Sequence, residues 1–305
     1  MWVVGIWMDP GIIEKIVGEM DDYSPDMGEI DGVPILQDTC NEWDEIYNFQ
    51  AREDDILVAS YPKSGTTWMQ EIMDLVSLEG DVQKSMRAPC FVKVPFLELG
   101  KTSLQYAKVM PCPRMLKVHL PVQLVPPSFW DKKTKIIYVA RNPKDCMVSY
   151  YHFQKMDNTM PDPGPWNEYF SSFLNGNVPW GNWFDHVIGW WKAKDQHKIL
   201  YVFYEDMIED PLREIKKVMT FMGKDLSEEV LQSIKHQTSF KIMKENPVVN
   251  YSNLSSVMDP AVSSFMRKGK VGDWKDHFLV SQNELFDAEY EKRMAGNGLR
   301  FRMKL

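Results

Sequence analysis

Three short hydrophobic runs, each followed by a polar turn and an amphipathic stretch, set the pattern of this chain. The runs occupy residues 56–60, 135–140 and 199–204. Continuous runs of this length that are rich in Ile, Leu and Val are typical of parallel strands buried on both faces. Because strands alternate here with helices, the pattern predicts an α/β fold with a central parallel β-sheet flanked by helices.

The stretches after these runs have helical periodicity. Apolar residues recur at helical spacing over about 66–76, a second helix runs through Tyr150, and a third is opened by Pro211 and closed near Gly223. An aromatic stripe within 183–191 also has helical spacing, and it predicts core packing rather than a cofactor site. Ligands of such folds bind where the parallel strands end, so the turns after the three runs are the candidate site.

The beginning of the chain has a different character. Residues 20–38 are rich in Asp, Gly and Pro and have little periodicity, which predicts an irregular acidic lead-in over 1–40 and an ordered core from about residue 45. Residues 1–8 are apolar but too short for a membrane span, and they lack the features of a signal peptide. We therefore expect a cytoplasmic protein with no membrane partner; whether residues 1–7 are native is open, because Met8 would also serve as a beginning.

Composition narrows the classes of ligand. The 305 residues are 44% hydrophobic, which is enough for a large core, and the chain has no repeat or linker, so we expect one domain over 1–305. A formal charge of −8 argues against a nucleic-acid partner. The four cysteines are far apart and form no metal-ligand pattern, which predicts reduced thiols and no metal.

The turn after the first run has the makings of an anion site. Lys63, Ser64, Gly65, Thr66 and Thr67 lie between the predicted strand and helix, where backbone N–H groups and the positive end of the helix converge. The alternative is an ordinary turn with a solvated lysine. The lysine precedes the glycine, so the loop is not GxxxxGK[ST], and we expect a phosphoanhydride held by cationic side chains without a metal.

Two longer motifs indicate a family. Residues 61–68 (YPKSGTTW) and 265–275 (FMRKGKVGDWK) resemble the two signature segments of the cytosolic sulfotransferases. The resemblance continues at 141–145, 149–153, 203–206 and 238–241, and it extends from Asp54 to the end of the chain. It is strongest with the phenol-type family 1, with the C branch as the candidate within it, and it implies a P-loop-kinase-like nucleotide-binding core.

The resemblance implies 3′-phosphoadenosine-5′-phosphosulfate (PAPS) as sulfuryl donor, PAP as product and no metal. The 61–68 loop would hold the phosphosulfate. The 3′-phosphate would be held by Arg141, Ser149, Arg267, Lys268 and Gly269, and the adenine would contact Trp68, Tyr204, Thr238 and Phe240. The alternatives for these residues are a solvated basic pair at 267–268 and core packing for the aromatic side chains.

The segment 115–121 alternates between apolar and polar residues, which puts Lys117 and His119 on the same face of a strand. By the resemblance His119 is the catalytic base, although a lone strand histidine is more often structural. Neutral His119 would take the proton of the acceptor hydroxyl before in-line attack on sulfur. Lys63, Lys117, Thr66 and Thr67 would stabilise the negative charge, and Ser149 completes the implied catalytic set.

The acceptor pocket is implied by aromatic residues that could equally belong to the core: Phe91, Phe96, Phe153 and Tyr251, with Met258. Together with Lys117 and His119 they suit a small, flat phenol, as in xenobiotic or hormone conjugation. Asp157 is a candidate partner for a cationic amine on the acceptor, and a solvated loop aspartate is the alternative.

The sequence leaves the state of assembly and two other functions open. Residues 275–284 (KDHFLVSQNE) resemble the KxxxTVxxxE segment through which family members dimerise, but Leu279 replaces the threonine, so a homodimer is a prediction with one departure. A nucleoside kinase would require magnesium and ATP. A non-catalytic phosphonucleotide-binding protein would require Lys117 and His119 to face away from the reactive end of the nucleotide.

Overall fold

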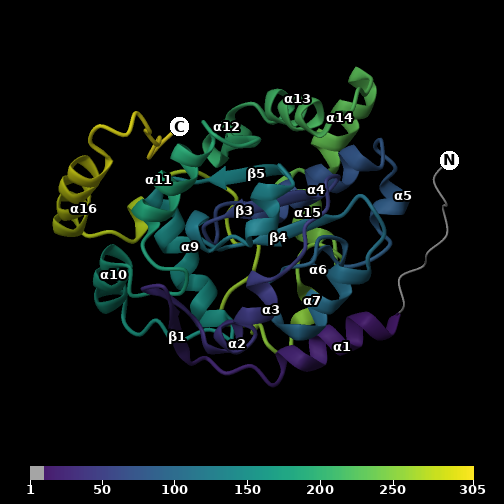
Figure 1. Ribbon diagram of the computed structural model, residues 1–305. Helices are drawn as coiled ribbons and strands as arrows, with labels where there is room; N and C mark the ends of the chain where they lie inside the picture. Colours follow the sequence, from purple (N-terminus) through teal and green to yellow (C-terminus); the bar gives the residue numbers. More distant parts are fainter. Residues whose placement is uncertain (1–9) are drawn as a thin grey trace.

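The predicted parallel sheet lies at the centre of the computed structural model, which describes residues 10–305 (Figure 1). Four strands, β3 (Ile56–Ser60), β4 (Met115–Val118), β5 (Lys135–Ala140) and β6 (Ile199–Phe203), form it in the order β4-β3-β5-β6. All three neighbouring pairs are parallel. The α/β prediction is therefore confirmed, and the carboxyl ends of all four strands meet at one edge.

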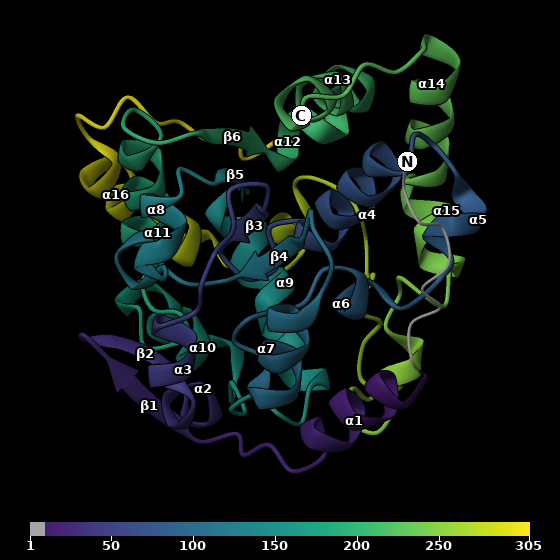
Figure 2. The same ribbon diagram turned by 45° about the vertical axis from the view of Figure 1, so that its right-hand side comes forward.

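Helices cover both faces of the sheet because alternate strand residues point in opposite directions. Val58 and Val139 pack against α4 (Thr66–Ser77), α13 (Pro211–Met222) and α14 (Glu228–Gln237). Leu57 and Tyr138 face the other way, toward α7 (Gly100–Val109), α9 (Pro143–Met156) and α11 (Trp183–Ala193). In Figure 2, α4 and α14 lie to the right of the strands and α11 lies to their left. The aromatic stripe in α11 belongs to the core, as predicted.

The predicted boundaries differ from the structure in a few places. β6 ends at Phe203, one residue before the predicted end, because Tyr204 begins α12 (Tyr204–Glu209). α9 continues to Met156, six residues past Tyr150, since the sequence offers no Gly or Pro before Asp157. β4 ends at Val118, and His119 and Leu120 continue the alternation outside the ladder.

The prediction of an irregular segment over 1–40 is wrong from residue 10 onward, and residues 1–9 lie outside the described residues. Helix α1 (Pro10–Met20) is followed by a hairpin of β1 (Met27–Ile30) and β2 (Val33–Leu36), then by α2 (Gln37–Asn41). Asp31 and Gly32 both have positive φ, as a tight hairpin turn requires. An Asp-Gly pair is itself a sequence signal for a hairpin turn, but the Asp-, Gly- and Pro-rich composition of the segment had indicated an irregular structure.

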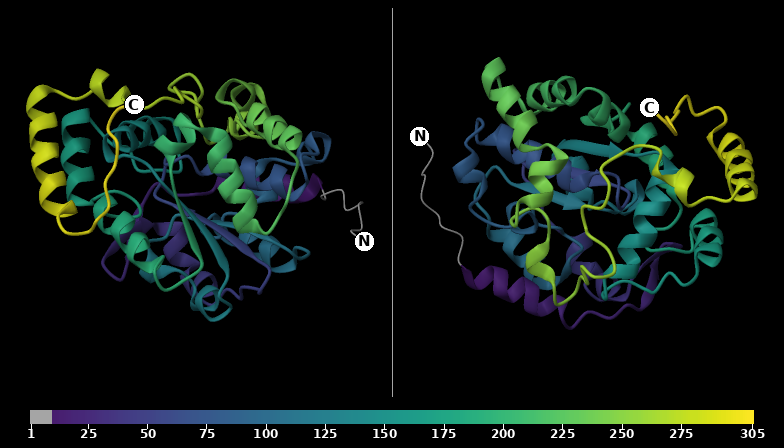
Figure 3. Two further views of the ribbon diagram at one scale, coloured as in Figure 1. Left: turned by 90° about the horizontal axis from the view of Figure 1, so that it is seen from above. Right: turned by 180° about the vertical axis from the view of Figure 1, so that it is seen from behind.

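The remaining elements surround this framework. The chain between α15 (Phe240–Glu245) and α16 (Val280–Met294), yellow-green in the right-hand view of Figure 3, crosses the back of the molecule. No helix within residues 10–305 is long and apolar enough to span a membrane. The other helices are α3 (Trp43–Tyr47), α5 (Val82–Ser85), α6 (Cys90–Lys93), α8 (Pro127–Asp131), α10 (Trp166–Asn175), η1 (Val122–Leu124), η2 (Ser252–Leu254) and η3 (Asp273–Asp276).

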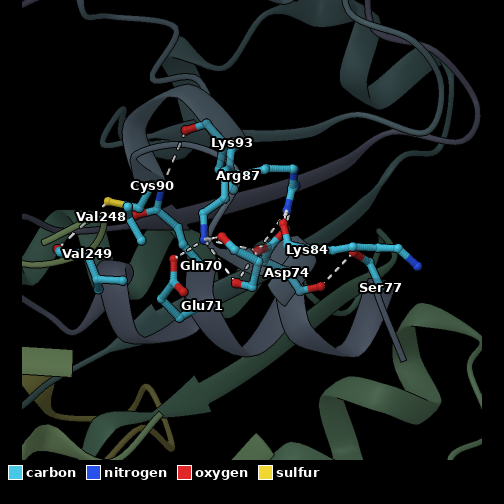
Figure 4. Close-up of polar contacts among 12 residues, drawn as sticks. Gln70, Glu71, Asp74, Ser77, Lys84, Arg87, Cys90, Lys93, Val248 and Val249 are labelled. Carbon is cyan, nitrogen blue, oxygen red and sulfur yellow. Dashed lines mark hydrogen bonds and ion pairs between the residues drawn. The ribbon is translucent and has the colours of Figure 1, made fainter. Parts of the chain in front are cut away.

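A buried ionic cluster fixes α6 against α4, the helix that follows the anion loop (Figure 4). The Lys93 ammonium lies 2.7 Å from Glu71 Oε1 and 3.0 Å from Asp74 Oδ2. Arg87 closes the cluster with an N–O distance of 2.6 Å to Asp74 Oδ1. Two cations thus face two carboxylates, which is the arrangement that makes buried charge tolerable.

Candidate active site

A cavity of about 430 Å³ lies at the edge where the parallel strands end. Its lining includes the loop after β3, His119 after β4, Arg141 after β5 and Tyr204 after β6. The site residues named from the sequence line this cavity, except Ser64 and, in the 61–68 loop, Tyr61, which are both buried. Ser64 Oγ lies 3.9 Å from Cys146 Sγ. Residues scattered over more than two hundred positions of the chain therefore share one space, although their roles remain predictions.

The loop before α4 is shaped to expose backbone N–H groups. Gly65 occupies the position before the helix with φ 103°, and Lys63 also has a positive φ, 66°. A Cβ atom on Gly65 would lie 2.7 Å from Cδ2 of Tyr204, so only glycine fits between the loop and that ring. The conformation aims the first turn of a twelve-residue helix at the cavity, which favours an anion there.

Two partly buried lysines make the same region strongly cationic. The Lys63 ammonium lies 3.9 Å from the ring centroid of Phe265 and 4.3 Å from that of Phe153, and the Lys117 ammonium lies 4.1 Å from that of Phe96. Burial, then the charges of Lys117 and Arg141, lower the pKa of Lys63 to about 7. Burial lowers the pKa of Lys117 to about 8. Within residues 10–305 neither ammonium forms a salt bridge, and positive charge of this kind is suited to a multiply charged anion.

His119 is held so that one ring nitrogen remains available to a ligand. Its Nδ1 atom lies 2.8 Å from the carbonyl oxygen of Ser60, which can only accept, so Nδ1 carries the proton and Nε2 is the acceptor nitrogen. Burial, then the charge of Lys117, hold the pKa of His119 well below its usual value. A neutral imidazole with a free Nε2 lone pair can act as a general base.

The second predicted phosphate site contains arginine donors that have no partner within residues 10–305. Arg141 donates to the carbonyl oxygens of Lys63 at 3.0 Å and Lys270 at 3.3 Å, but its buried Nε is unsatisfied. Arg267 lies 2.6 Å from Asp273 Oδ2, and its buried Nε is unsatisfied as well. Buried donors that lack an acceptor fit the phosphate oxygens of a ligand.

Aromatic residues surround the remaining part of this region. Trp68 and Tyr204 meet edge to face with centroids 5.8 Å apart, and the buried Trp68 Nε1 also lacks a partner. Phe240 lines the cavity beside Gly269, whereas the Thr238 hydroxyl already donates to the Ile234 carbonyl oxygen. Together with the unpaired arginine donors, this set fits a nucleotide that carries anionic groups at two places. Within residues 10–305 no cluster of His, Cys, Asp or Glu has the makings of a metal site.

The opposite part of the cavity is apolar. Phe91, Phe96, Phe153 and Tyr251 line it as predicted, and the Phe91 and Tyr251 rings stack with centroids 6.1 Å apart. Further lining residues were not predicted from the sequence: Met20, Leu36, Leu99, Met160, Trp180, Leu254 and Phe265. Met20 and Leu36 come from the segment predicted to be irregular. Phe265 begins the second signature motif and could have been found there.

Asp157 lies at the apolar end of the cavity and is 5% exposed. Its Oδ1 accepts from the Thr159 backbone N–H at 3.0 Å and from the Thr159 hydroxyl at 2.7 Å. Burial raises the pKa of Asp157, and the Thr159 hydrogen bonds and the Lys63 charge oppose that rise. The solvated loop aspartate considered from the sequence is therefore wrong for this residue.

The comparisons with known proteins agree with this geometry. The family model described as "Sulfotransferase domain" matches residues 53–298. Human sulfotransferase 1C2 is 53% identical over 282 residues, covering 91% of this chain and 95% of the relative. Sulfotransferase 1A1 of Bos taurus is 48% identical over 290 residues, covering 93% and 98%. Mouse sulfotransferase SULT7A1, solved in complex with PAP, has a TM-score of 0.74 at 32% identity, covering 88% and 95%.

Proposed function

This chain belongs to family 1 of the PAPS-dependent sulfotransferases, and from that premise we propose that its acceptor is the hydroxyl of a small phenol and that His119 is the general base. The single observation that carries the proposal is the position of His119, with Nδ1 bound to Ser60 and Nε2 available, in the cavity shared by Lys63 and Lys117. The apolar wall around Phe91, Phe96 and Phe153 supports a flat aromatic acceptor.

The donor supplies a sulfuryl group whose S–O bond to phosphate breaks as the acceptor oxygen bonds to sulfur. His119 Nε2 takes the acceptor proton, and Lys63 and Lys117 stabilise the negative charge that grows on the departing phosphate oxygen. The N–H groups and threonine hydroxyls of the 61–68 loop, with Ser149, assist there. Arg141, Arg267, Lys268 and Gly269 hold the 3′-phosphate, and Trp68 and Phe240 hold the adenine ring by stacking.

Transfer assays with labelled PAPS across phenols, catecholamines, iodothyronines and hydroxysteroids test the acceptor class. His119→Ala should lower turnover with phenols by about 10²-fold or more while PAP affinity is kept. His197→Ala is the matched control, because His197 is exposed and precedes β6, at the opposite edge of the sheet. Unchanged turnover in His119→Ala would contradict the assignment of His119 as the general base. Tight PAP binding without transfer to any acceptor would favour a binding protein, and phosphate transfer from ATP with magnesium would favour a kinase.

We also propose that residues 275–284 form a homodimer contact. Two adjacent apolar side chains of this segment face solvent in the single chain, Leu279 at 58% and Val280 at 77% exposure. Apolar side chains that protrude together at the start of a helix are suited to burial against a second copy. Leu279, which stands where the family segment has threonine, adds to this apolar surface.

A further inference from the structure

A single buried carboxylate joins the proposed base to the wall of the acceptor cavity. Glu98 lies between α6 and α7 and is 4% exposed. Its Oε2 accepts the His119 backbone N–H at 2.6 Å, and its Oε1 accepts the Trp180 indole N–H at 2.5 Å. The two oxygens of one side chain therefore hold two segments that are sixty residues apart and line the same cavity.

The two segments meet around the imidazole ring. The His119 ring has edge-to-face contacts with Trp180 and Phe96, with centroid distances of 5.4 and 5.0 Å. Trp180 itself has an unusual positive φ of 64°, and its backbone N–H donates to the Pro34 carbonyl oxygen at 2.8 Å. A tryptophan in this conformation persists only where its surroundings define it, and the Glu98 carboxylate is one of those surroundings.

The carboxylate is not replaceable by a neutral group of the same shape. Each oxygen of the Glu98 carboxylate accepts one N–H group. An amide in its place has one oxygen and one NH₂ group, so the NH₂ group would face one of the two N–H donors and that donor would have no acceptor. Protonation of Glu98 has a similar but smaller effect, because the oxygen that carries the proton is a weaker acceptor for its N–H donor. The direction of His119 and the position of Trp180 thus depend together on an ionised Glu98.

We propose that Glu98 is a positioning residue for the transfer reaction: through its two oxygens it orients His119 and sets Trp180 against the acceptor. This inference rests on the proposed function, because it takes His119 as the base. It adds that the loop between α6 and α7 controls the base, and that Trp180 and the hairpin residue Pro34 belong to the same hydrogen-bonded unit.

The charge state of Glu98 makes the proposal measurable. Burial raises the pKa of Glu98 to about 7, against the lowering effects of the Trp180 and His119 N–H donors and the Lys117 charge. The other ionisable groups around His119 are Lys63, Lys117 and His186, and burial lowers the pKa of His186 to about 4. At saturating donor the phosphates hold the two lysines protonated, so Glu98 is the group expected to titrate near neutral pH.

The test compares kcat at saturating PAPS and phenol over pH 6–8.5. In the wild type kcat should fall toward low pH with a midpoint near 7, as Glu98 takes up a proton. Glu98→Gln should lower kcat at pH 8 about tenfold, which is the effect of one lost hydrogen bond to a charged group. It should also abolish the decrease of kcat toward low pH, the acidic limb of the profile, while PAP affinity is kept. A Glu98→Gln enzyme with the wild-type pH profile and kcat would overturn the proposal.

Two further variants keep the test decisive if Glu98→Gln does not fold. Trp180→Phe retains the carboxylate but removes one N–H donor that lowers its pKa, so the acidic limb should move to higher pH. Thr39→Val is the matched control, because the Thr39 hydroxyl donates to the backbone oxygen of Glu98 at 3.2 Å and leaves the carboxylate alone. It should leave the limb in place. An unshifted limb in Trp180→Phe, or an equal shift in Thr39→Val, contradicts the role of Glu98. Absence of transfer in the wild type would instead overturn the proposed function.

Discussion

Gly269 lies so close to Phe240 that a Cβ atom on Gly269 would overlap the aromatic ring. Gly269 has a φ of 62°, so its place in the loop is set both by backbone conformation and by the neighbouring ring. Phe240 lines the part of the cavity that we propose holds the nucleotide. The glycine therefore allows the ring to lie where we propose that adenine stacks.

Gly269→Ala should weaken PAP binding about tenfold or more, because the methyl group must displace Phe240 from the cavity wall. Gly272→Ala is the matched control. Gly272 also has a positive φ, 90°, but a Cβ atom there meets nothing within 4 Å. Both variants carry a backbone strain of about 1–2 kcal/mol, and only Gly269→Ala disturbs the ring. Equal PAP dissociation constants for the two, measured by calorimetry, would argue against the stacking role of Phe240.

Donor binding should be coupled to proton uptake by Lys63 and Lys117, the two partly buried lysines of the cavity. The pKa of Lys63 is lowered to about 7 and that of Lys117 to about 8, so both lose charge as pH rises through this range. An anion favours their protonated forms, and PAP affinity should therefore decrease between pH 7 and 9. Titration calorimetry at pH 8 in buffers of different ionisation enthalpy should reveal proton uptake. Lys63→Met should reduce it and Lys132→Met, at the surface, should not; binding without any uptake would refute the coupling.

Asp157 should favour acceptors that carry an amine. Thr159 occupies Oδ1, so a substrate ammonium would meet Oδ2 in a largely dehydrated environment where charge pairing is strong. We expect Asp157→Asn to lower kcat/KM for dopamine about tenfold and to change that for the uncharged 4-ethylcatechol by much less. Parallel assays of the two substrates provide the internal control. Equal losses for both would show that Asp157 acts on the fold of the cavity and not on amine recognition.

The sequence predicted the sheet because each central strand is buried on both faces. The runs 56–60 and 135–140 coincide with β3 and β5, and the convergence of Lys63, His119 and Arg141 follows from parallel strands that end at one edge. The hairpin around Asp31 was not predicted, because polar and small residues interrupt the alternation of apolar and polar positions in its strands. Glu98 and Trp180 lie in loops without periodicity, and their contact depends on tertiary packing that no local pattern records.

The ionic cluster around Lys93 should contribute strongly to stability. Lys93 is 1% exposed and is the cation shared by Glu71 and Asp74. Lys93→Met would remove the ion pair of buried Glu71 and would leave Asp74 with Arg87 and the Ser85 hydroxyl. Loss of one member of such a cluster costs about 3–5 kcal/mol. Lys84→Met is the matched control: Lys84 pairs with Asp81 at 2.9 Å but is 48% exposed, and its loss should change stability by about 0.5 kcal/mol or less. Urea denaturation gives both values, and equal effects would contradict the proposed weight of the cluster.

The proposed contact between two copies of residues 275–284 can be tested at the exposed Val280. If residues 275–284 pair two chains, Val280→Asp should place a charge in an apolar contact and convert a dimer to a monomer in sedimentation equilibrium. Val109→Asp is the matched control, because Val109 is 78% exposed, close to the 77% of Val280, but lies on α7 outside the segment. Exchange of Lys275 and Glu284 for each other should preserve a contact in which they pair across the two-fold axis. A monomeric wild type at micromolar concentration, or dissociation by Val109→Asp as well, would rule this contact out, because exposure alone would then not distinguish the segment from the rest of the surface.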